Sequence, residues 1–241
     1  MKSKILLFTL VSICILSCKS DDESPQNPTD GKLLSHIDWE TDDKIEFTYN
    51  DDRTIKTINI SEDIILHFSY TNNRIETLIF QWGQAGGSDI YRYTYDDNSK
   101  INSISKGEET FTVTYQSAEQ SYQYEPDEGE SVKIFMEDED VRRLLVDYGP
   151  DTYTYAYQYL ESKGPIAGSN ACSLHIIMAL PDPLIAYILN CFSKKTIQSY
   201  QDGDNNLEFE NELDENSVLI SRDYQDYNGE PATDVFNYTQ L

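Results

Sequence analysis

Residues 90–104 read Ile-Tyr-Arg-Tyr-Thr-Tyr-Asp-Asp-Asn-Ser-Lys-Ile-Asn-Ser-Ile. The tyrosines of the first half alternate with polar residues, and a period of two predicts a strand with one buried face. The residues at 96–100 are typical of a turn, and an apolar pattern resumes at Ile101. The segment therefore predicts a β-hairpin.

The same pattern recurs through the first half of the chain. Alternating residues interrupted by turn residues predict further hairpins at 45–60 and 64–80, and a weaker one from 111 onward. A tyrosine ends the first strand of each unit, with spacings of 21, 25 and 20 positions: Tyr49, Tyr70, Tyr95 and Tyr115. A period of this length with two strands per unit predicts a meander of consecutive hairpins.

The second half is less regular but of the same kind. A strand is predicted at 132–136, and residues 137–146 are ambiguous between a strand and a short acidic helix. Residues 152–160 place four tyrosines on one face of a strand, and Asn228-Gly229 indicates a hairpin near the end. We therefore expect one mainly all-β domain, an antiparallel meander covering 33–241.

The most apolar segment of the second half, residues 173–192, breaks this pattern. Its length suggests a membrane span, but Pro181-Asp182-Pro183 divides it into pieces that are too short. Asp182 as the N-cap and Pro183 at the first helical position predict a short helix at 183–192. Because its residues are apolar almost all round, we expect this helix to be buried against the concave face of the sheet.

The N-terminus is typical of an exported protein. Residues 1–17 carry two lysines and then an apolar run, which predicts a signal peptide. The end of that run, Leu-Ser followed by Cys18, resembles a bacterial lipobox, and this resemblance implies that Cys18 is acylated and anchors the protein in outer-membrane lipid. Residues 18–32 are polar and acidic and predict a disordered tether. They resemble the export tag of surface-exposed lipoproteins; an ordinary signal peptide with an incidental cysteine is the alternative.

The net charge narrows the set of possible partners, and two cysteines of the second half allow two interpretations. The formal net charge of −25 at pH 7 repels nucleic acids and anionic lipid surfaces, which makes both poor partners. In the second half, Cys172 and Cys191 form either a disulfide or two buried thiols, and the sequence leaves this open.

The tyrosine faces are the candidate ligand-binding residues. They could form an open aromatic platform suited to sugar rings, or they could be core residues whose hydroxyl groups find partners. The residues concerned are Tyr91, Tyr93, Tyr95, Tyr153, Tyr155, Tyr157 and Tyr159.

No catalytic, metal or cofactor motif stands out. The three histidines are isolated, and 43 acidic residues make the proximity of two carboxylates uninformative. The acidic runs at 137–140 and 202–206 have the oxygen density of calcium loops, but charged turns account for both. We therefore expect no enzyme activity, no cofactor and no metal.

Several of these features together resemble a known family. Tyr-Asp-Asn-type turns such as residues 95–101 look like the tyrosine–aspartate repeat of secreted bacterial proteins. The lipobox, tether, aromatic hairpins, residues 163–165, the apolar helix and a hairpin at 224–231 resemble a family of bacterial lipoproteins of unknown function with a porin-like fold. This resemblance implies a sheet curled into an open or half barrel and no assigned activity. The polar outer faces do not fit a membrane-inserted porin.

These expectations combine into one functional interpretation. The chain is expected to be an envelope-anchored, non-catalytic binding or scaffolding module at the bacterial cell surface or in the periplasm. Its partner would be a glycan, a peptide or an envelope protein. The alternative is a lipid or lipoprotein carrier with an apolar cavity in the half barrel, and a glycoside hydrolase is less favoured than either.

Overall fold

The computed structural model describes residues 32–39, 43–83, 86–167, 169, 172–180, 192–203, 205–226 and 228–240. The predicted signal peptide, Cys18, almost all of the tether, Cys191 and the helix predicted at 183–192, apart from Phe192, lie outside these residues. The predictions made for them are therefore not tested by the structure.

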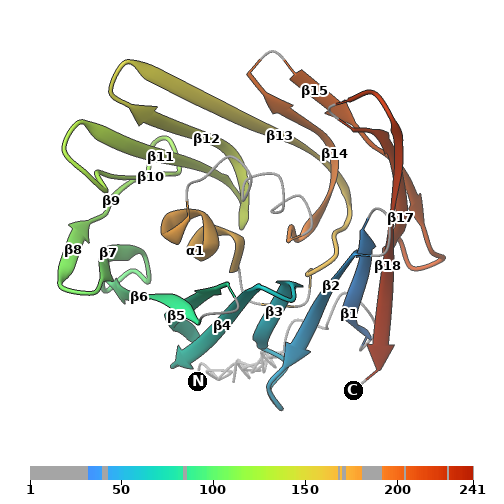
Figure 1. Cartoon of the computed structure of the whole chain (residues 1–241), viewed down its shortest axis with the longest axis horizontal. Coiled ribbons are helices and arrows are strands. Elements are labelled where there is room, and N and C mark those ends of the chain that lie inside the picture. The colour runs from blue at the N-terminus through green and yellow to red at the C-terminus, as the bar shows by residue number, and fades with distance from the viewer. Residues whose placement is uncertain are drawn as a thin grey trace, which may run out of the picture.

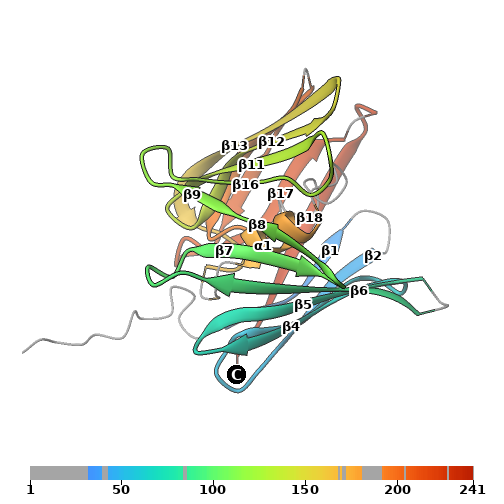
Figure 2. The same ribbon diagram turned by 90° about the vertical axis from the view of Figure 1, so that its left-hand side faces the viewer.

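The described strands form two antiparallel sheets that curve around a shared interior (Figures 1 and 2). The eleven-stranded sheet has the order β16-β17-β18-β1-β2-β3-β4-β5-β6-β7-β8. Its strands are β1 (Lys32–Trp39), β2 (Asp43–Tyr49), β3 (Ile55–Ser61), β4 (Ile64–Thr71), β5 (Arg74–Trp82), β6 (Gly87–Tyr95), β7 (Ile101–Lys106), β8 (Glu109–Thr112), β16 (Glu210–Leu213), β17 (Leu219–Gln225) and β18 (Pro231–Gln240).

The seven-stranded sheet has the order β15-β14-β13-β12-β11-β10-β9. Its strands are β9 (Thr114–Gln116), β10 (Ser121–Tyr124), β11 (Glu130–Glu137), β12 (Asp140–Tyr148), β13 (Asp151–Lys163), β14 (Lys195–Asp202) and β15 (Asn205–Glu208). The curled, mainly antiparallel fold predicted from the sequence is confirmed. The ambiguous segment 137–146 is strand, because β11 and β12 form a hairpin there.

The single sheet expected from the sequence is divided into two at a pair of bends. One residue, Val113, separates β8 from β9, and one residue, Phe209, separates β15 from β16. The N–H of Val113 donates to the carbonyl of Asn102 at 2.9 Å, and that of Phe209 donates to Gln198 at 3.0 Å. Both side chains are buried. The chain therefore passes from one sheet to the other within a bent strand, as at the corners of other two-sheet proteins.

The first and last strands are neighbours in the larger sheet. β1 pairs antiparallel with β18, so that Lys32 lies opposite Gln240. Other neighbouring strands in both sheets follow one another in sequence. The two ends of the described chain therefore lie side by side within the larger sheet, while the two sheets are not closed into a barrel.

A short helix, α1 (Cys172–Ala179), lies in the interior between the sheets (Figure 1). Ile176, Ile177 and Met178 are almost completely buried. The hydroxyl of Tyr93 donates to the carbonyl of His175 at 2.6 Å, and that of Tyr124 donates to the carbonyl of Met178 at 2.8 Å. A buried interior helix is thus present in the first half of the apolar segment, where the sequence analysis had not placed one. No helix of the described ranges is long and apolar enough to cross a membrane.

A recurring tyrosine contact closes the open ends of the hairpins. In each case a tyrosine near the end of one strand donates its hydroxyl to a backbone carbonyl near the start of the preceding strand. The pairs are Tyr49 with Leu34, Tyr70 with Ile55, Tyr95 with Ile75, Tyr159 with Val141 and Tyr238 with Leu219, at 2.6–2.9 Å. We call these contacts tyrosine clamps.

Aspartates stabilise the turns that follow or precede these strands. The carboxylate of Asp226 accepts the backbone N–H groups of Asn228 and Glu230, and that of Asp214 accepts those of Asn216 and Val218. These bonds favour the charged form and lower the pKa of both carboxyl groups. Asp96, which directly follows the clamp residue Tyr95, accepts the backbone N–H groups of Asn98 and Lys100, so the Tyr-Asp pattern combines a clamp with a capped turn there.

Candidate functional site

Four of the seven tyrosines predicted to bind a ligand lie in the core. Tyr91, Tyr93, Tyr155 and Tyr157 are each 5% exposed or less. Burial raises the pKa of the Tyr91 and Tyr93 hydroxyl groups. The structure therefore favours the core interpretation for these four rings, which the sequence had left open.

The other three tyrosines have different surroundings. Tyr95 and Tyr159 are half-buried, and each forms a tyrosine clamp. Tyr153 is 41% exposed and lies edge-on to Tyr148, with ring centroids 5.8 Å apart. Of the seven predicted residues, Tyr153 alone is exposed, and Tyr95 alone lines the inter-sheet pocket described next.

A partly enclosed pocket of about 220 Å³ lies between the two sheets beside α1. The larger sheet contributes the end of β6, the turn after it and the start of β7. The smaller sheet contributes residues of β9, β10 and β11 and the turns before β10 and after β11, and the helix contributes Leu174 and His175. The full lining is Tyr95, Ser99, Lys100, Ile101, Tyr115, Gln120, Tyr122, Met136, Asp138, Glu139, Leu174 and His175. We call it the inter-sheet pocket.

Aromatic rings and one ammonium group give the inter-sheet pocket its chemistry. The rings of Tyr115 and Tyr122 lie 4.8 Å apart at 49°, and the Lys100 ammonium lies 4.6 Å from the centre of the Tyr115 ring. Burial raises the pKa of the Tyr122 hydroxyl to about 12, which keeps it protonated and able to donate. Flat rings beside hydrogen-bonding groups suit a small polar ligand.

His175 is held in a defined orientation at the inner end of the inter-sheet pocket. The Tyr95 hydroxyl donates its hydrogen to the carbonyl of Ile75 at 2.6 Å, so its contact with His175 Nε2 at 2.8 Å requires a hydrogen on that nitrogen. The Tyr93 ring packs edge-on against the imidazole at 4.8 Å. His175 looks isolated in the sequence because its partners are about 80 residues away in the chain.

The acidic run at 137–140 lies at the rim of the same pocket and is paired with lysines. Lys195 Nζ lies 2.9 Å from the carboxylate of Asp138, and Lys194 pairs with Glu139. The carboxylate of Asp140 is buried and accepts the backbone N–H groups of Lys194 and Lys195. These contacts join the β11–β12 turn to the start of β14.

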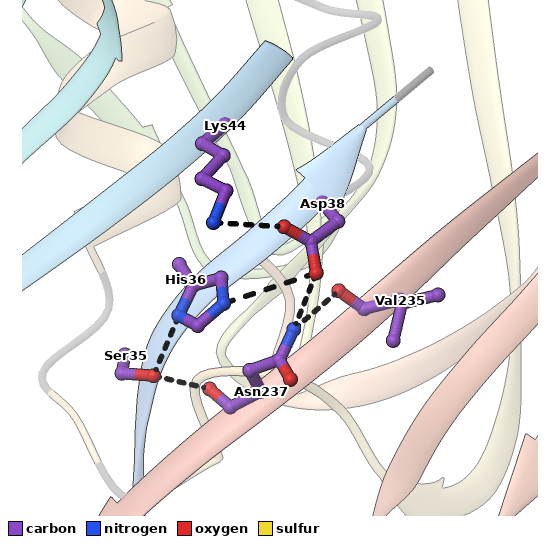
Figure 3. Close-up of polar contacts among 6 residues, drawn as sticks. All are labelled: Ser35, His36, Asp38, Lys44, Val235 and Asn237. Carbon is purple, nitrogen blue, oxygen red and sulfur yellow. Dashed lines mark hydrogen bonds and ion pairs between the residues drawn. The ribbon is translucent and has the colours of Figure 1, made fainter. Parts of the chain in front are cut away.

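A second polar cluster lies on β1 and resembles a Ser-His-Asp series (Figure 3). Ser35 Oγ is 3.0 Å from His36 Nδ1, but His36 Nε2 is 3.8 Å from Asp38. The Ser35 hydroxyl donates to the carbonyl of Asn237 at 2.9 Å. Its single hydrogen is therefore not available to His36, and the arrangement does not activate a nucleophile.

The cluster on β1 instead joins three strands. Asn237 on β18 donates to Asp38 at 2.9 Å, and Lys44 on β2 lies 3.5 Å from the other oxygen of the same carboxylate. A bulge between Leu34 and His36 places two successive side chains where they can meet. We interpret this cluster as a structural contact between β18, β1 and β2.

The described part of the chain contains no group of three or more metal-ligating side chains. The pairing of Cys172 with Cys191 remains a prediction, since Cys191 lies outside the described residues. No protein-family model matches the chain, and no curated protein matches it in sequence.

Solved structures resemble the chain over most of its length. A porin-like protein from Bacteroides uniformis has a TM-score of 0.50 and 13% identity, covering 87% of this chain and 97% of that one. The chain has a porin-like fold. A porin-like protein from Bacteroides vulgatus covers 87% of this chain and 100% of its own, with 9% identity and a TM-score of 0.43. The porin-like fold implied by the sequence resemblance is confirmed by the first of these structures.

Proposed function

We propose that this chain is a non-catalytic binding module that is anchored in the bacterial outer membrane through an acylated Cys18. The lipobox-like sequence and the acidic tether support the anchor. The similarity to a porin-like Bacteroides protein is compatible with a role in the cell envelope. Its partner in this proposal is a glycan or another polar envelope ligand, with the lipid contact made by Cys18.

The inter-sheet pocket carries this proposal. Its volume of about 220 Å³ corresponds to about seven water molecules at ~30 Å³ each, which is below the usual range for drug-sized ligands. It therefore fits a single small unit, such as a terminal sugar ring. The rings of Tyr115 and Tyr122, the Lys100 ammonium and the Gln120 amide offer the stacking and hydrogen bonding that such a unit needs.

The carrier and hydrolase alternatives have less support. A carrier needs an apolar cavity of several hundred Å³, whereas apolar side chains of α1 such as Ile176 and Ile177 pack into the interior. A glycoside hydrolase needs a carboxylic acid in surroundings that favour its protonated form. Asp138 and Glu139 at the pocket rim instead face lysine ammonium groups, and Asp140, whose pKa is raised by burial, does not line the pocket.

Binding at the inter-sheet pocket is tested by a glycan array followed by calorimetry on the purified protein. We expect Tyr115→Leu and Lys100→Gln each to weaken the affinity for the best glycan by about tenfold, which corresponds to ~1.4 kcal/mol. Tyr153→Leu should leave that affinity unchanged. Loss of binding in Tyr153→Leu alone would place the ligand on the exposed tyrosine face and contradict the pocket.

The anchor is tested separately by labelling cells with palmitate while they express the full chain. Labelled protein should be found in the outer-membrane fraction, and Cys18→Ala should abolish both the label and the membrane association. An unlabelled wild-type protein would contradict the anchor without affecting the binding experiment.

A further inference from the structure

A cluster of cationic side chains lies on the outer face of the smaller sheet, away from the inter-sheet pocket's aromatic lining. In β11, Val132 and Ile134 belong to the core, so the alternation of the strand points Phe135 outward. Phe135 is nevertheless only 5% exposed. Three cations cover its ring: the Arg143 guanidinium at 3.9 Å, the Lys133 ammonium at 5.0 Å and the Arg142 guanidinium at 6.0 Å from its centre.

The backbone of the β11–β12 hairpin brings these side chains together. Phe135 lies directly opposite Arg143, and a bulge follows between Phe135 and Met136. Stacking on an aromatic face holds a guanidinium in place, which reduces the entropy lost when it binds a ligand. The two arginines are thus oriented by the fold while both side chains remain exposed.

The charges of this cluster are only partly balanced. Lys133 forms a 2.6 Å ion pair with Glu119, and this contact lowers the pKa of that carboxyl group. Within the described residues, neither Arg142 nor Arg143 lies within ion-pair distance of a carboxylate. A groove of about 580 Å³ runs over the arginines, and its lining also includes Gln120 and two acidic residues, Glu119 and Glu137. Two guanidinium groups therefore face solvent in a chain whose net charge is −25.

We propose that the groove formed by Phe135, Arg142, Arg143 and Gln120 binds an oxyanion, the carboxylate or phosphate group of an acidic glycan. A planar guanidinium matches both groups with two parallel hydrogen bonds. The net charge of the rest of the protein repels anions, so an acidic ligand is expected to approach the protein at this groove. This groove adjoins the inter-sheet pocket, because Gln120 lines both, but Arg142 and Arg143 line the groove and not the pocket.

The test uses calorimetry with three probes: a galacturonic acid trimer, a neutral galactose trimer and inorganic phosphate. We expect the uronate to bind, the neutral trimer not to bind in this groove, and the combined Arg142→Gln and Arg143→Gln variant to lose affinity by about tenfold or more. The matched control replaces Lys56 and Arg92, which are exposed on the larger sheet, with glutamine. It removes the same charge and should change the affinity by less than about twofold.

One further variant tests the role of the neighbouring carboxylate. Glu119→Gln removes one of the two carboxylates that line the groove and should tighten uronate binding several-fold, because it releases Lys133 and removes one repulsive charge. Phosphate binding without uronate binding would assign the site to phosphate groups and still support an oxyanion site. The proposal is overturned if neither anion binds, or if the control variant loses as much affinity as the arginine variant.

Discussion

Asp140 illustrates how a single buried carboxylate can control stability. It begins β12, is 2% exposed and accepts the backbone N–H groups of Lys194 and Lys195. Burial raises the pKa of its carboxyl group to about 6, although those two hydrogen bonds act in the opposite direction. The start of β14 is thus hydrogen-bonded to a carboxyl group that loses its proton between weakly acidic and neutral pH.

The raised pKa has a defined consequence for the pH dependence of unfolding. In the unfolded chain Asp140 should titrate near 3.8, so the folded state binds the extra proton between that pH and about 6. The stabilisation from this group is complete below about pH 3.8 and is lost as the pH rises through 6, by up to ~3 kcal/mol. Carbon NMR of the carboxyl group should show a midpoint near 6, and a midpoint near 4 would contradict this account.

At the scale of the elements, the tyrosine clamps explain why the repeat has its period. Each clamp joins the open end of a hairpin whose other end is closed by a turn, so one tyrosine is needed in every two strands. Tyr115 was predicted to be the fourth member of this series. The bend at Val113 takes its strand into the other sheet, and its ring packs against Tyr122 instead.

A conservative substitution tests the clamp. Tyr95→Phe keeps the ring but removes the hydroxyl that donates to Ile75 and accepts from His175. We expect a loss of about 1–3 kcal/mol in the free energy of unfolding, because two buried polar partners, the Ile75 carbonyl and the His175 ring, lose a hydrogen bond. The control is Tyr153→Phe, whose ring is largely exposed, and it should change stability by less than about 0.5 kcal/mol in the same urea titration. Equal losses in the two variants would show that the clamp does not contribute to the free energy of unfolding.

At the scale of the whole molecule, the pairing of β1 with β18 brings the ends of the described chain together. Lys32 and Gln240 are opposite one another in this pair, so a linker of a few residues can join them. The two long-range polar contacts between these strands, at Ser35 and Asp38, add to the backbone ladder.

This arrangement predicts that a circular permutant will fold. The permutant joins residue 240 to residue 32 and begins at Glu128, in the exposed turn between β10 and β11. We expect a cooperative thermal transition within about 10 °C of the parent, because no strand pair is lost. A second permutant opened between Thr77 and Leu78, inside β5, should not fold. If the first permutant also failed to fold, the two ends of the described chain would not lie side by side in the β1–β18 pair.

The repeat, the turn residues and the antiparallel strands could be predicted because they depend on local patterns. Tyrosines at every second position predict a strand with one buried face, and the Asp-Asn turns predict a return strand. The division into two sheets could not be predicted, since Val113 and Phe209 lie within otherwise ordinary strand patterns. The helix at 172–179 was missed, because its residues are apolar on every side and show no period that separates helix from strand.

The sequence by itself determined the hairpins of the first half, their order and the negative net charge, because alternation and charge are properties of neighbouring residues. It predicted no strand for β1 or for β14 to β16, which the structure adds. Tertiary structure alone decided which tyrosines lie in the core, what surrounds His175 and which cations gather on Phe135. Each of these depends on contacts between strands or on partners far apart in the chain, such as Tyr95 and His175. The curvature of the two sheets brings such partners together, and this curvature cannot be predicted from local sequence patterns.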